Sequence, residues 1–523
     1  MEPTSLDKAS YRSLPHKGQL AILMLARIAE PLAASSIQSY MFFQLRHFDP
    51  SAGPATISAQ AGLILSSKTA AHVSTGLFWG RFADSEYGSR KLVLVVGLVS
   101  SGVAMLGYGF SESIEAAVAW QVLDGILNSS ISMIRCLTAE LYPEKRYRVR
   151  ALTLLPLCAS AGMFAGPLLG GFLSSPGGDD GKGRAIRYPY AAPNIAVAAY
   201  SFILAALVSL GLEHSRENMQ NGGRSIFRRF WNARQMQPPD HLNQGDNANA
   251  TCTESAPLLH DRLAPHQQSD PIPSSTPDDI SPETIQPRRR RPRFRQIWTP
   301  NVLSTMLAHF IISGHLGTFS SLWAIFLSTP PGAEENRSPW SFSGGLGMDA
   351  RGVGVIVTLL GAMSVLSQII VYPCLHDRFG TVGVWRAALY FFPATYLLAP
   401  FSALLASDSA TAADRALLYI AVLGVLLLFN AGRTGVAPAT SLLINDCTPH
   451  PSVRATIHTM GTIVGNLGRS VFPAIILPVY GLGLAVGVAG LGFWALAALA
   501  VVACLVSGRV VEGANGKDVS LQE

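Results

Sequence analysis

Six ionisable side chains lie inside long apolar runs of this sequence, where a charge is costly to keep. Each such group costs roughly 2.5 to 3.5 kcal/mol at the centre of a membrane, so it is rarely retained without a partner or a function. A carboxylate that loses its water favours the protonated form, and it can then take up and release a proton near neutral pH. The six residues are Arg27, Glu30, Lys68, Asp124, Arg135 and His315.

Glu30, Asp124 and His315 are the candidates for binding a proton. Glu30 follows Arg27 by three residues, so the two share a helix face and can pair. Asp124 can pair with Lys68, and histidine titrates near neutrality without any shift. The alternatives are a fixed salt bridge between Arg27 and Glu30, a permanently charged Asp124 and a histidine that is only hydrogen-bonded in a core. We expect Glu30 to be the group that takes up and releases a proton, with Asp124 second. The expected charge partners are Arg27, Lys68 and Arg135.

Membrane-spanning helices must position these groups. Of the 523 residues, 49% are hydrophobic and only 14% are charged, whereas soluble domains have about 25% charged residues. Twelve apolar runs approach the roughly 20 residues that a helix needs to cross a bilayer. The sequence therefore predicts an all-α integral membrane protein with twelve transmembrane helices in two six-helix bundles. The expected helices cover about 19–41, 58–79, 92–110, 116–137, 152–173, 194–212, 302–326, 353–372, 384–405, 416–436, 455–479 and 482–506.

Polar segments divide the chain into parts. The N-terminus has no apolar core of a signal peptide, and the segment after the sixth run is rich in Pro, Asn, Asp and Ser with an arginine run at 288–291, which is typical of disorder. The net charge of +6 gathers in loops that the positive-inside rule places in the cytosol. The expected parts are a cytosolic tail at 1–17, a six-helix bundle at 18–212, a disordered cytosolic linker at 213–299, a second bundle at 300–507 and a cytosolic tail at 508–523.

A charged turn separates the second and third expected helices. Gly80 permits two helix ends to approach closely, and Gly88 can adopt a positive φ. Asp84 can hold a basic side chain or a helix N-terminus. Together with Arg90 and Lys91, these residues form what we expect to be a latch between moving helices.

Glycines recur at four-residue spacing in the fifth expected helix. Gly162, Gly166 and Gly170 lay a smooth stripe for tight helix contact, with Gly171 beside it. Pro167 is expected to kink the helix.

The turn from Gly80 to Lys91 resembles the signature loop of the major facilitator superfamily, whose usual form is Gly-x-x-x-Asp-x-x-Gly-Arg-Lys. It departs from that form by one extra residue between Asp84 and Gly88 and by Ser89 before Arg90. The glycine stripe resembles the antiporter motif of the twelve-span drug:proton antiporters in that family. This resemblance implies export in exchange for protons.

Further residues are similar to a branch rich in fungal members, related to zinc-induced-facilitator-like and tetracycline-resistance permeases. In that branch an arginine usually stands four residues before Gly125, where this sequence has Gln121. The residues that carry the similarity are Arg27 to Pro31, Asn128, Arg135, Glu140, Arg187 to Asn194 and Ser313 to His315.

The resemblance implies a secondary active transporter that moves a small organic compound, drug-like or a secondary metabolite, by alternating access. Amide and aromatic side chains suit an amphipathic organic substrate, although ordinary packing is the alternative for each; Arg433 would suit an anion or snorkel to lipid headgroups. The substrate-cavity candidates are Gln38, Gln121, Asn128, Phe319, Trp323 and Asn430.

Other function classes are less compatible with the sequence. The six cysteines lack metal or disulfide spacing, and no catalytic constellation indicates an enzyme, so we expect no cofactor, no metal and no nucleic-acid partner. A monomer in the lipid bilayer that binds its substrate and protons is expected. An importer or facilitator of the same fold, or a non-transporting membrane sensor, remains an alternative.

Two short motifs concern location. The segment from Glu254 to Leu259 resembles an acidic dileucine sorting signal of vacuoles or endosomes, yet we expect the plasma membrane, with the vacuolar membrane as the alternative. Asn336 begins a glycosylation sequon in a loop expected outside the cell. A glycan on Asn249, in the expected linker, would overturn this topology.

Overall fold

The computed structural model describes residues 15–85, 88–142, 144–175, 187–212, 297–332, 341–406, 411–449 and 454–513. Their regular elements are helices, and these residues form only two isolated β-bridges, Pro331 to Gly344 and Phe342 to Val488. The expected all-α class is therefore confirmed. The expected linker, apart from 297–299, and Asn336 lie outside the described residues.

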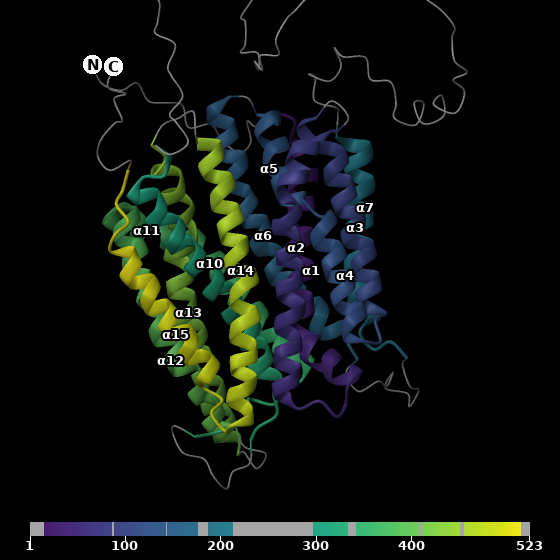
Figure 1. The fold of residues 1–523 in the computed structure, drawn as a ribbon, viewed down its shortest axis with the longest axis vertical. Coiled ribbons are helices and arrows are strands. Elements are labelled where there is room, and N and C mark those ends of the chain that lie inside the picture. The colour runs from purple at the N-terminus through teal and green to yellow at the C-terminus, as the bar shows by residue number, and fades with distance from the viewer. Residues whose placement is uncertain are drawn as a thin grey trace, which may run out of the picture. The chain divides into compact units, whose positions relative to one another are not determined.

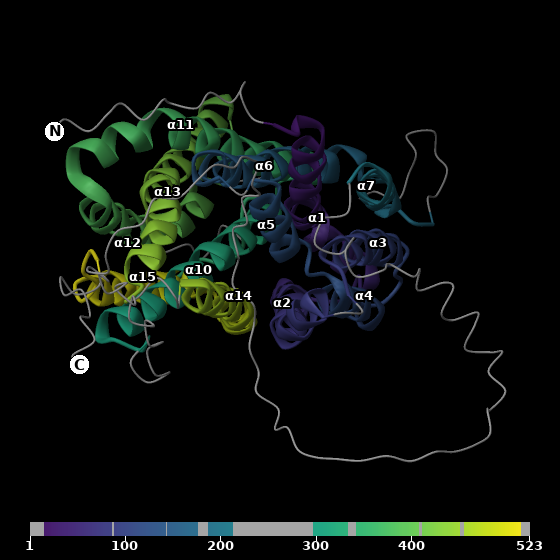
Figure 2. The ribbon, with the colours of Figure 1, turned by 90° about the horizontal axis from the view of Figure 1, so that it is seen from above.

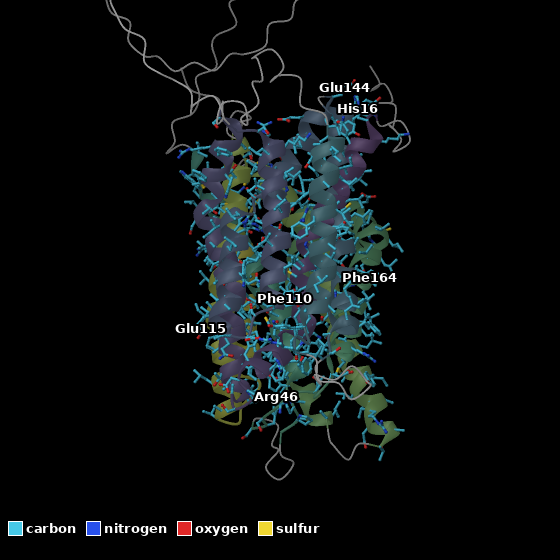
Figure 3. All side chains as sticks on the ribbon, turned by 90° about the vertical axis from the view of Figure 1, so that its right-hand side faces the viewer. His16, Arg46, Phe110, Glu115, Glu144 and Phe164 are labelled. Atoms are coloured by element: carbon cyan, nitrogen blue, oxygen red, sulfur yellow. The ribbon has the colours of Figure 1, made fainter. Side chains whose placement is uncertain are left out.

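The N-terminal half consists of long helices that run parallel to one axis (Figure 1). His16, before the first helix, and Glu144, before the sixth, lie at one end, whereas Arg46 lies at the opposite end (Figure 3). The first helix thus traverses the full length of the bundle. The helices are α1 (Lys17–Phe48), α2 (Pro54–Asp84), α3 (Arg90–Gly109), α4 (Ile114–Leu127), α5 (Ser130–Leu141), α6 (Lys145–Leu173) and α7 (Ala191–Gly211).

The C-terminal half has the same architecture. Its longest helix, α11, is interrupted by Gly380 at φ 68°, so that it makes one pass and begins the next. Gly380 thus forms the turn between these two passes. The elements are α10 (Pro300–Ser328), α11 (Ala350–Leu389), α12 (Phe391–Leu398), the 3-10 helix η4 (Ala399–Leu405), α13 (Ala412–Asp446), α14 (Arg454–Ala485) and α15 (Leu491–Ser507).

Twelve passes fit this arrangement. Among the described residues, eight helical segments are long and apolar enough to cross a membrane, and one of them, 350–405, contains two passes. The shorter α15, the more polar α2 and the pair α4 with α5 account for the others. The expected multi-pass membrane protein is confirmed.

Several expected helix ends were wrong: α1 continues to Phe48 rather than 41, and α13 to Asp446 rather than 436. Two further differences concern a break and a start. The fourth helix, expected over 116–137, breaks between α4 and α5 at Asn128 and Ser129. The last helix, expected from 482, begins at Leu491, because the chain remains helical in α14 up to Ala485.

Helix pairing repeats between the two halves. In the first half α1 packs on α6, α2 on α4 and α3 on α7; in the second half α10 packs on α14, α11 on α13 and α12 on α15. Each pair occupies the corresponding place in its half, which supports two pseudo-symmetric bundles. Figure 2 shows where the halves meet, with α6 beside α11 and α2 beside α14.

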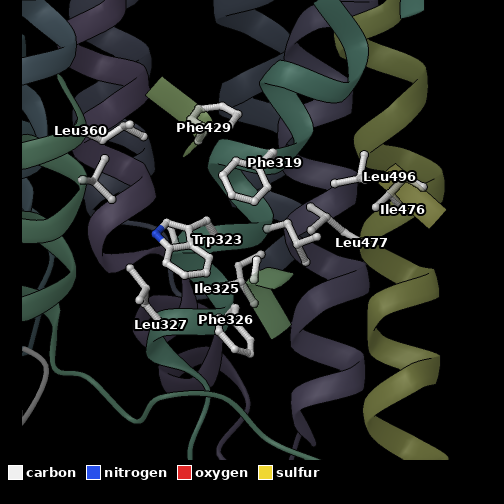
Figure 4. Packing of buried hydrophobic residues seen from close by; sticks show 14 of the residues in the cluster. Phe319, Trp323, Ile325, Phe326, Leu327, Leu360, Phe429, Ile476, Leu477 and Leu496 are labelled. Carbon is white, nitrogen blue, oxygen red and sulfur yellow. The ribbon is translucent and has the colours of Figure 1, made fainter. Parts of the chain in front are cut away.

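An aromatic core fills the C-terminal half. Phe319 and Trp323 of α10 stack with ring centroids 5.8 Å apart, and the Phe319 ring lies 4.4 Å from that of Phe429 on α13. Figure 4 shows these rings together with apolar side chains of α14 and α15, such as Leu477 and Leu496. These contacts make this region a packed core.

Candidate functional site

The glycine stripe of α6 holds α1 at close range. A Cβ atom added at Gly162 would lie 2.7 Å from the carbonyl oxygen of Ile28, and one added at Gly166 would lie 2.6 Å from that of Leu32. Real Cβ atoms do not approach so closely, so only glycine fits. The tight contact expected from the stripe is confirmed, and it fixes the segment of α1 that carries Arg27 and Glu30.

The second half contains a matching contact that sequence reasoning missed. Gly465 and Gly468 of α14 face His309 and Phe310 of α10, and a Cβ atom at Gly465 would lie 2.5 Å from Nε2 of His309. Because α14 and α10 correspond to α6 and α1, glycines set the same helix contact in both halves.

We expect Gly166→Ala to destabilise the folded protein by about 1 to 3 kcal/mol, the usual cost of overpacking. The added methyl group would meet the α1 backbone at Leu32. The matched control is Gly80→Ala, because no atom lies within 4 Å of a Cβ atom there. The melting temperatures of the two purified variants would be compared with that of the parent protein; an equal melting temperature for all three would contradict the proposed contact.

Glu30 is a carboxylate among several cations. Its Oε2 atom and Nη1 of Arg27 are buried without a hydrogen-bond partner, and within the described residues the two side chains form no salt bridge. The fixed salt bridge considered from the sequence is therefore not formed. Glu30 interacts electrostatically with Arg27, Lys68, Arg135 and Arg469, which come from α1, α2, α5 and α14.

A small cavity lies beside Arg27 and Glu30. Its volume of about 10 Å³ holds about one water molecule. Ser101, Asn128 and Ser130 add polar atoms to its wall. The space can therefore hold a water molecule beside the carboxylate of Glu30.

Asp124 and Lys68 form an ion pair. Nζ of Lys68 lies 2.5 Å from Oδ2 of Asp124, which is only 2% exposed, and Nδ2 of Asn128 donates a hydrogen bond of 3.2 Å to Oδ1. The neighbouring Gly125 permits this contact, because a Cβ atom there would lie 2.8 Å from that of Ala71 on α2. The alternative in which Asp124 pairs with Lys68 is the arrangement observed.

Asn128 explains the break between α4 and α5. Its Oδ1 atom accepts a hydrogen bond of 3.0 Å from the backbone N–H of Ser130. Such a bond offers the backbone an alternative to the helical pattern. The break places Asn128 beside Asp124 at the wall of the cavity.

Arg135 and Arg469 line a space that is open to solvent. Both are exposed, yet Arg135 interacts electrostatically with Arg27, Arg469 and Glu30, so these side chains face one another rather than the lipid. Sequence reasoning missed Arg469 and its neighbour His309. An arginine within the apolar run 455–479 satisfies the rule that selected the other six residues and could have been found.

The open cleft narrows toward the opposite end of the helices. There a Cβ atom at Gly481 of α14 would lie 2.5 Å from the carbonyl oxygen of Ala55 on α2, and one at Gly171 of α6 would lie 2.6 Å from that of Ala350 on α11. Ala55 lies near the end of α1 that carries Arg46 (Figure 3). The halves are thus in close contact at this end, whereas the exposed guanidinium groups lie toward the other.

His315 occupies the aromatic core. It is fully buried, its Nδ1 atom lies 2.8 Å from the hydroxyl oxygen of Tyr396, and its ring lies edge-on to that of Phe392. Its Nε2 atom is buried without a partner. This environment agrees with the hydrogen-bonded core histidine that the sequence left open, and His315 lies apart from the Glu30 cluster.

The substrate-cavity candidates do not come together. Phe319 and Trp323 belong to the packed core, and Asn430 accepts a hydrogen bond from Ser364 and donates one to Ser367 on α11. Gln38 reaches across the halves to Oγ of Ser321 at 3.3 Å, while Gln121 and Asn128 are buried in the N-terminal half. Only Asn128 among the six lines the cavity beside Glu30.

The expected latch is joined to neighbouring helices of its own half. Arg90 forms an ion pair with Glu140 at the end of α5, and Nζ of Lys91 donates a hydrogen bond of 2.6 Å to the carbonyl oxygen of Leu212. Two details differ from expectation. Gly88 does not have a positive φ and is needed instead because a Cβ atom would collide with the carbonyl group of Phe82; Gly80 makes no close approach. The side chain of Asp84 lies outside the described residues.

Comparison with known proteins agrees with this architecture. Residues 23–473 match the sequence profile of the Major Facilitator Superfamily. A major facilitator superfamily multidrug transporter of Aspergillus fumigatus, mfsB, is 27% identical over 96% of this chain and 84% of its own. The efflux pump azaK of Aspergillus niger is 22% identical over 88% of this chain and 81% of its own.

A solved structure shows the same fold. The D-xylose-proton symporter superposes with a TM-score of 0.60 over 96% of this chain and 99% of its own, at 10% sequence identity. At so low an identity the similarity concerns the fold alone. No enzyme is indicated, and the chain has the architecture of a membrane transporter.

Proposed function

We propose that this chain, a transporter that belongs to the Major Facilitator Superfamily, exports a small organic compound, drug-like or a secondary metabolite, in exchange for protons. The observation that carries the proposal is the carboxylate of Glu30, which forms no ion pair with a described residue and lies beside a water-sized cavity. Relatives named as a multidrug transporter and an efflux pump support the direction of transport.

Glu30 is the group best suited to bind the coupling proton. A water-sized cavity lies beside it, and among the described residues no fixed salt bridge holds its charge. Asp124, by contrast, is held by Lys68 and Asn128. Protonation of Glu30 changes the charge that faces Arg27, Arg135 and Arg469, so it can bias the two open states of the carrier.

Alternating access requires the halves to rock about this cleft. The contacts of Gly171 with Ala350 and of Gly481 with Ala55 would open when the carrier releases substrate on the other side. The latch residues Arg90 and Lys91 would steady the N-terminal half during this movement through Glu140 and Leu212.

The remaining parts of the proposal follow the topology expected from the sequence. The end with His16 and Glu144 faces the cytosol, the bundles 18–212 and 300–507 are the moving domains, and Asn336 carries a glycan outside. The protein acts as a monomer in the plasma membrane, with the vacuolar membrane as the alternative, and it needs no cofactor. An importer of the same fold is the competing function.

The proposal is tested by accumulation of a panel of amphipathic organic compounds in yeast that lacks its own pumps. We expect cells with this protein to accumulate at least one compound about threefold less than cells without it, because export works against entry. A protonophore should abolish the difference by removing the proton gradient. Higher accumulation would reverse the direction, and insensitivity to the protonophore would contradict proton coupling.

A further inference from the structure

The cleft carries more positive than negative charge. Arg27, Arg135 and Arg469 reach it from three helices, and Glu30 is the carboxylate that interacts with all three. The nearby Asp124 cannot offset them, because Lys68 already pairs with it at 2.5 Å. Within the described helices, every other acidic residue lies in an end turn, except Asp377, which lies next to the Gly380 kink of α11 and is exposed. Glu30 can thus offset one of the three guanidinium charges, and the other two have no counter-charge among the described helices.

The guanidinium groups are available to a ligand. Nη1 of Arg27 is buried without a partner. Arg135 and Arg469 are exposed to the solvent of the cleft and form no hydrogen bond or ion pair with a described residue. Arg433 of α13 adds a fourth guanidinium group where the halves meet, with Nη2 only 3.2 Å from the sulfur atom of Met163 on α6. Charges inside a membrane protein are rarely kept without a functional partner.

Apolar surface lies next to these cations. Ala26, Leu98, Ile131 and Ile134 form the wall of the cavity beside Arg27. A ligand with an anionic head and an apolar body would contact both kinds of surface once the cavity, which now holds about one water molecule, widens around it. An inorganic anion would use only the guanidinium groups.

We propose that the transported compound is an amphipathic organic anion whose carboxylate, sulfonate or phosphate group binds among Arg27, Arg135 and Arg469. The planar guanidinium group donates paired hydrogen bonds that match such oxyanions. The inference rests on the proposed function in one respect, namely that this cleft is the transport site. It does not depend on proton coupling.

The charge of Glu30 predicts the direction in which anion affinity changes when this residue is replaced. Its negative charge opposes an anion, so Glu30→Gln should tighten anion binding by about three- to tenfold, as expected for a charge several ångströms away in a partly solvated site. Arg469→Gln should weaken the same binding by about tenfold. A ligand that is a cation would show the reverse pattern in both variants.

The test uses the full-length protein, purified in detergent without any proton gradient. The probes are 2-naphthoate and 2-naphthalenesulfonate as anions, 2-naphthamide as the neutral counterpart, 2-naphthylmethylamine as the cation, and sodium sulfate as an inorganic anion. Binding is measured by the ligand-dependent shift of the melting temperature. We expect both aromatic anions to bind at least tenfold more tightly than the amide, the amine and sulfate.

Arg469→Lys, which retains the charge, is the matched control for Arg469→Gln, and the melting temperature without ligand reports on folding. Tighter binding of the amine, equal binding of the amide, or binding of neither anion would overturn the inference. If sulfate binds as tightly as naphthalenesulfonate, the ligand is an inorganic rather than an organic anion, and this result would overturn the inference as well. Anion binding without proton-driven export would instead contradict only the proposed function.

Discussion

Replacing Lys68 by alanine is expected to destabilise the folded protein by about 3 to 5 kcal/mol, the usual cost of removing one partner of a buried ion pair. Asp124, only 2% exposed, would lose the ammonium group at 2.5 Å and retain only the amide of Asn128 at 3.2 Å. The melting temperature and folded yield of the purified variant in detergent measure this loss.

The double variant Lys68→Met with Asp124→Leu is the control. It removes both charges together, so no uncompensated charge remains, and apolar pairs of similar volume are often as stable as a buried ion pair. We expect it to recover most of the stability that Lys68→Ala loses. If the double variant is less stable than the single one, or if Lys68→Ala melts at the parent temperature, the ion pair does not have the structural role assigned to it.

Local patterns in the sequence predicted most of the fold. The length of an apolar run is a property of a single segment, and it located the helices, although some of their ends differ by about seven to ten residues. The last boundary was wrong because the expected break at 480–481 is helical. Gly481 instead lies inside α14, where it permits the backbone of Ala55 to approach. A glycine that breaks a helix and one that packs against another helix look alike in sequence.

The candidate site was only partly predictable for a different reason. The rule that a charge within an apolar run needs a function identified Arg27, Glu30 and Arg135, but not which helices bring them together. Arg469 joins them only because α14 packs against α2 and α10. Conversely, Phe319 and Trp323 have the residue types of a substrate cavity, yet the fold places them in a packed aromatic core.

Protons and an anionic substrate would influence each other in this cleft. Protonation of Glu30 removes the same negative charge as Glu30→Gln, so a bound anion and a bound proton favour each other. Export in exchange for protons therefore requires a further step. After the carrier has released the anion outside and bound a proton, it must return to the cytosolic side without substrate. If it cannot, the same cleft carries anion and proton together, which is the chemistry of the competing importer.

Glu30→Gln separates these roles, and it is expected to abolish proton-driven transport while leaving substrate exchange intact. Glutamine has nearly the shape of glutamate but cannot bind a proton at physiological pH. In proteoliposomes we expect accumulation driven by a pH gradient to fall by more than tenfold, because the variant no longer senses the gradient. Exchange of labelled for unlabelled substrate without a gradient should continue, since Arg27, Arg135 and Arg469 remain in place.

The matched variant is Asp124→Asn, which removes the second carboxylate considered for coupling. Lys68 then lacks its counter-ion, so we expect lower stability and a parallel loss of gradient-driven transport and of exchange. If Asp124→Asn loses only gradient-driven transport while Glu30→Gln is still driven by the gradient, Asp124 rather than Glu30 binds the coupling proton. Loss of both activities in a well-folded Glu30→Gln variant would show instead that Glu30 contacts the substrate itself, as a carboxylate facing a cationic ligand would.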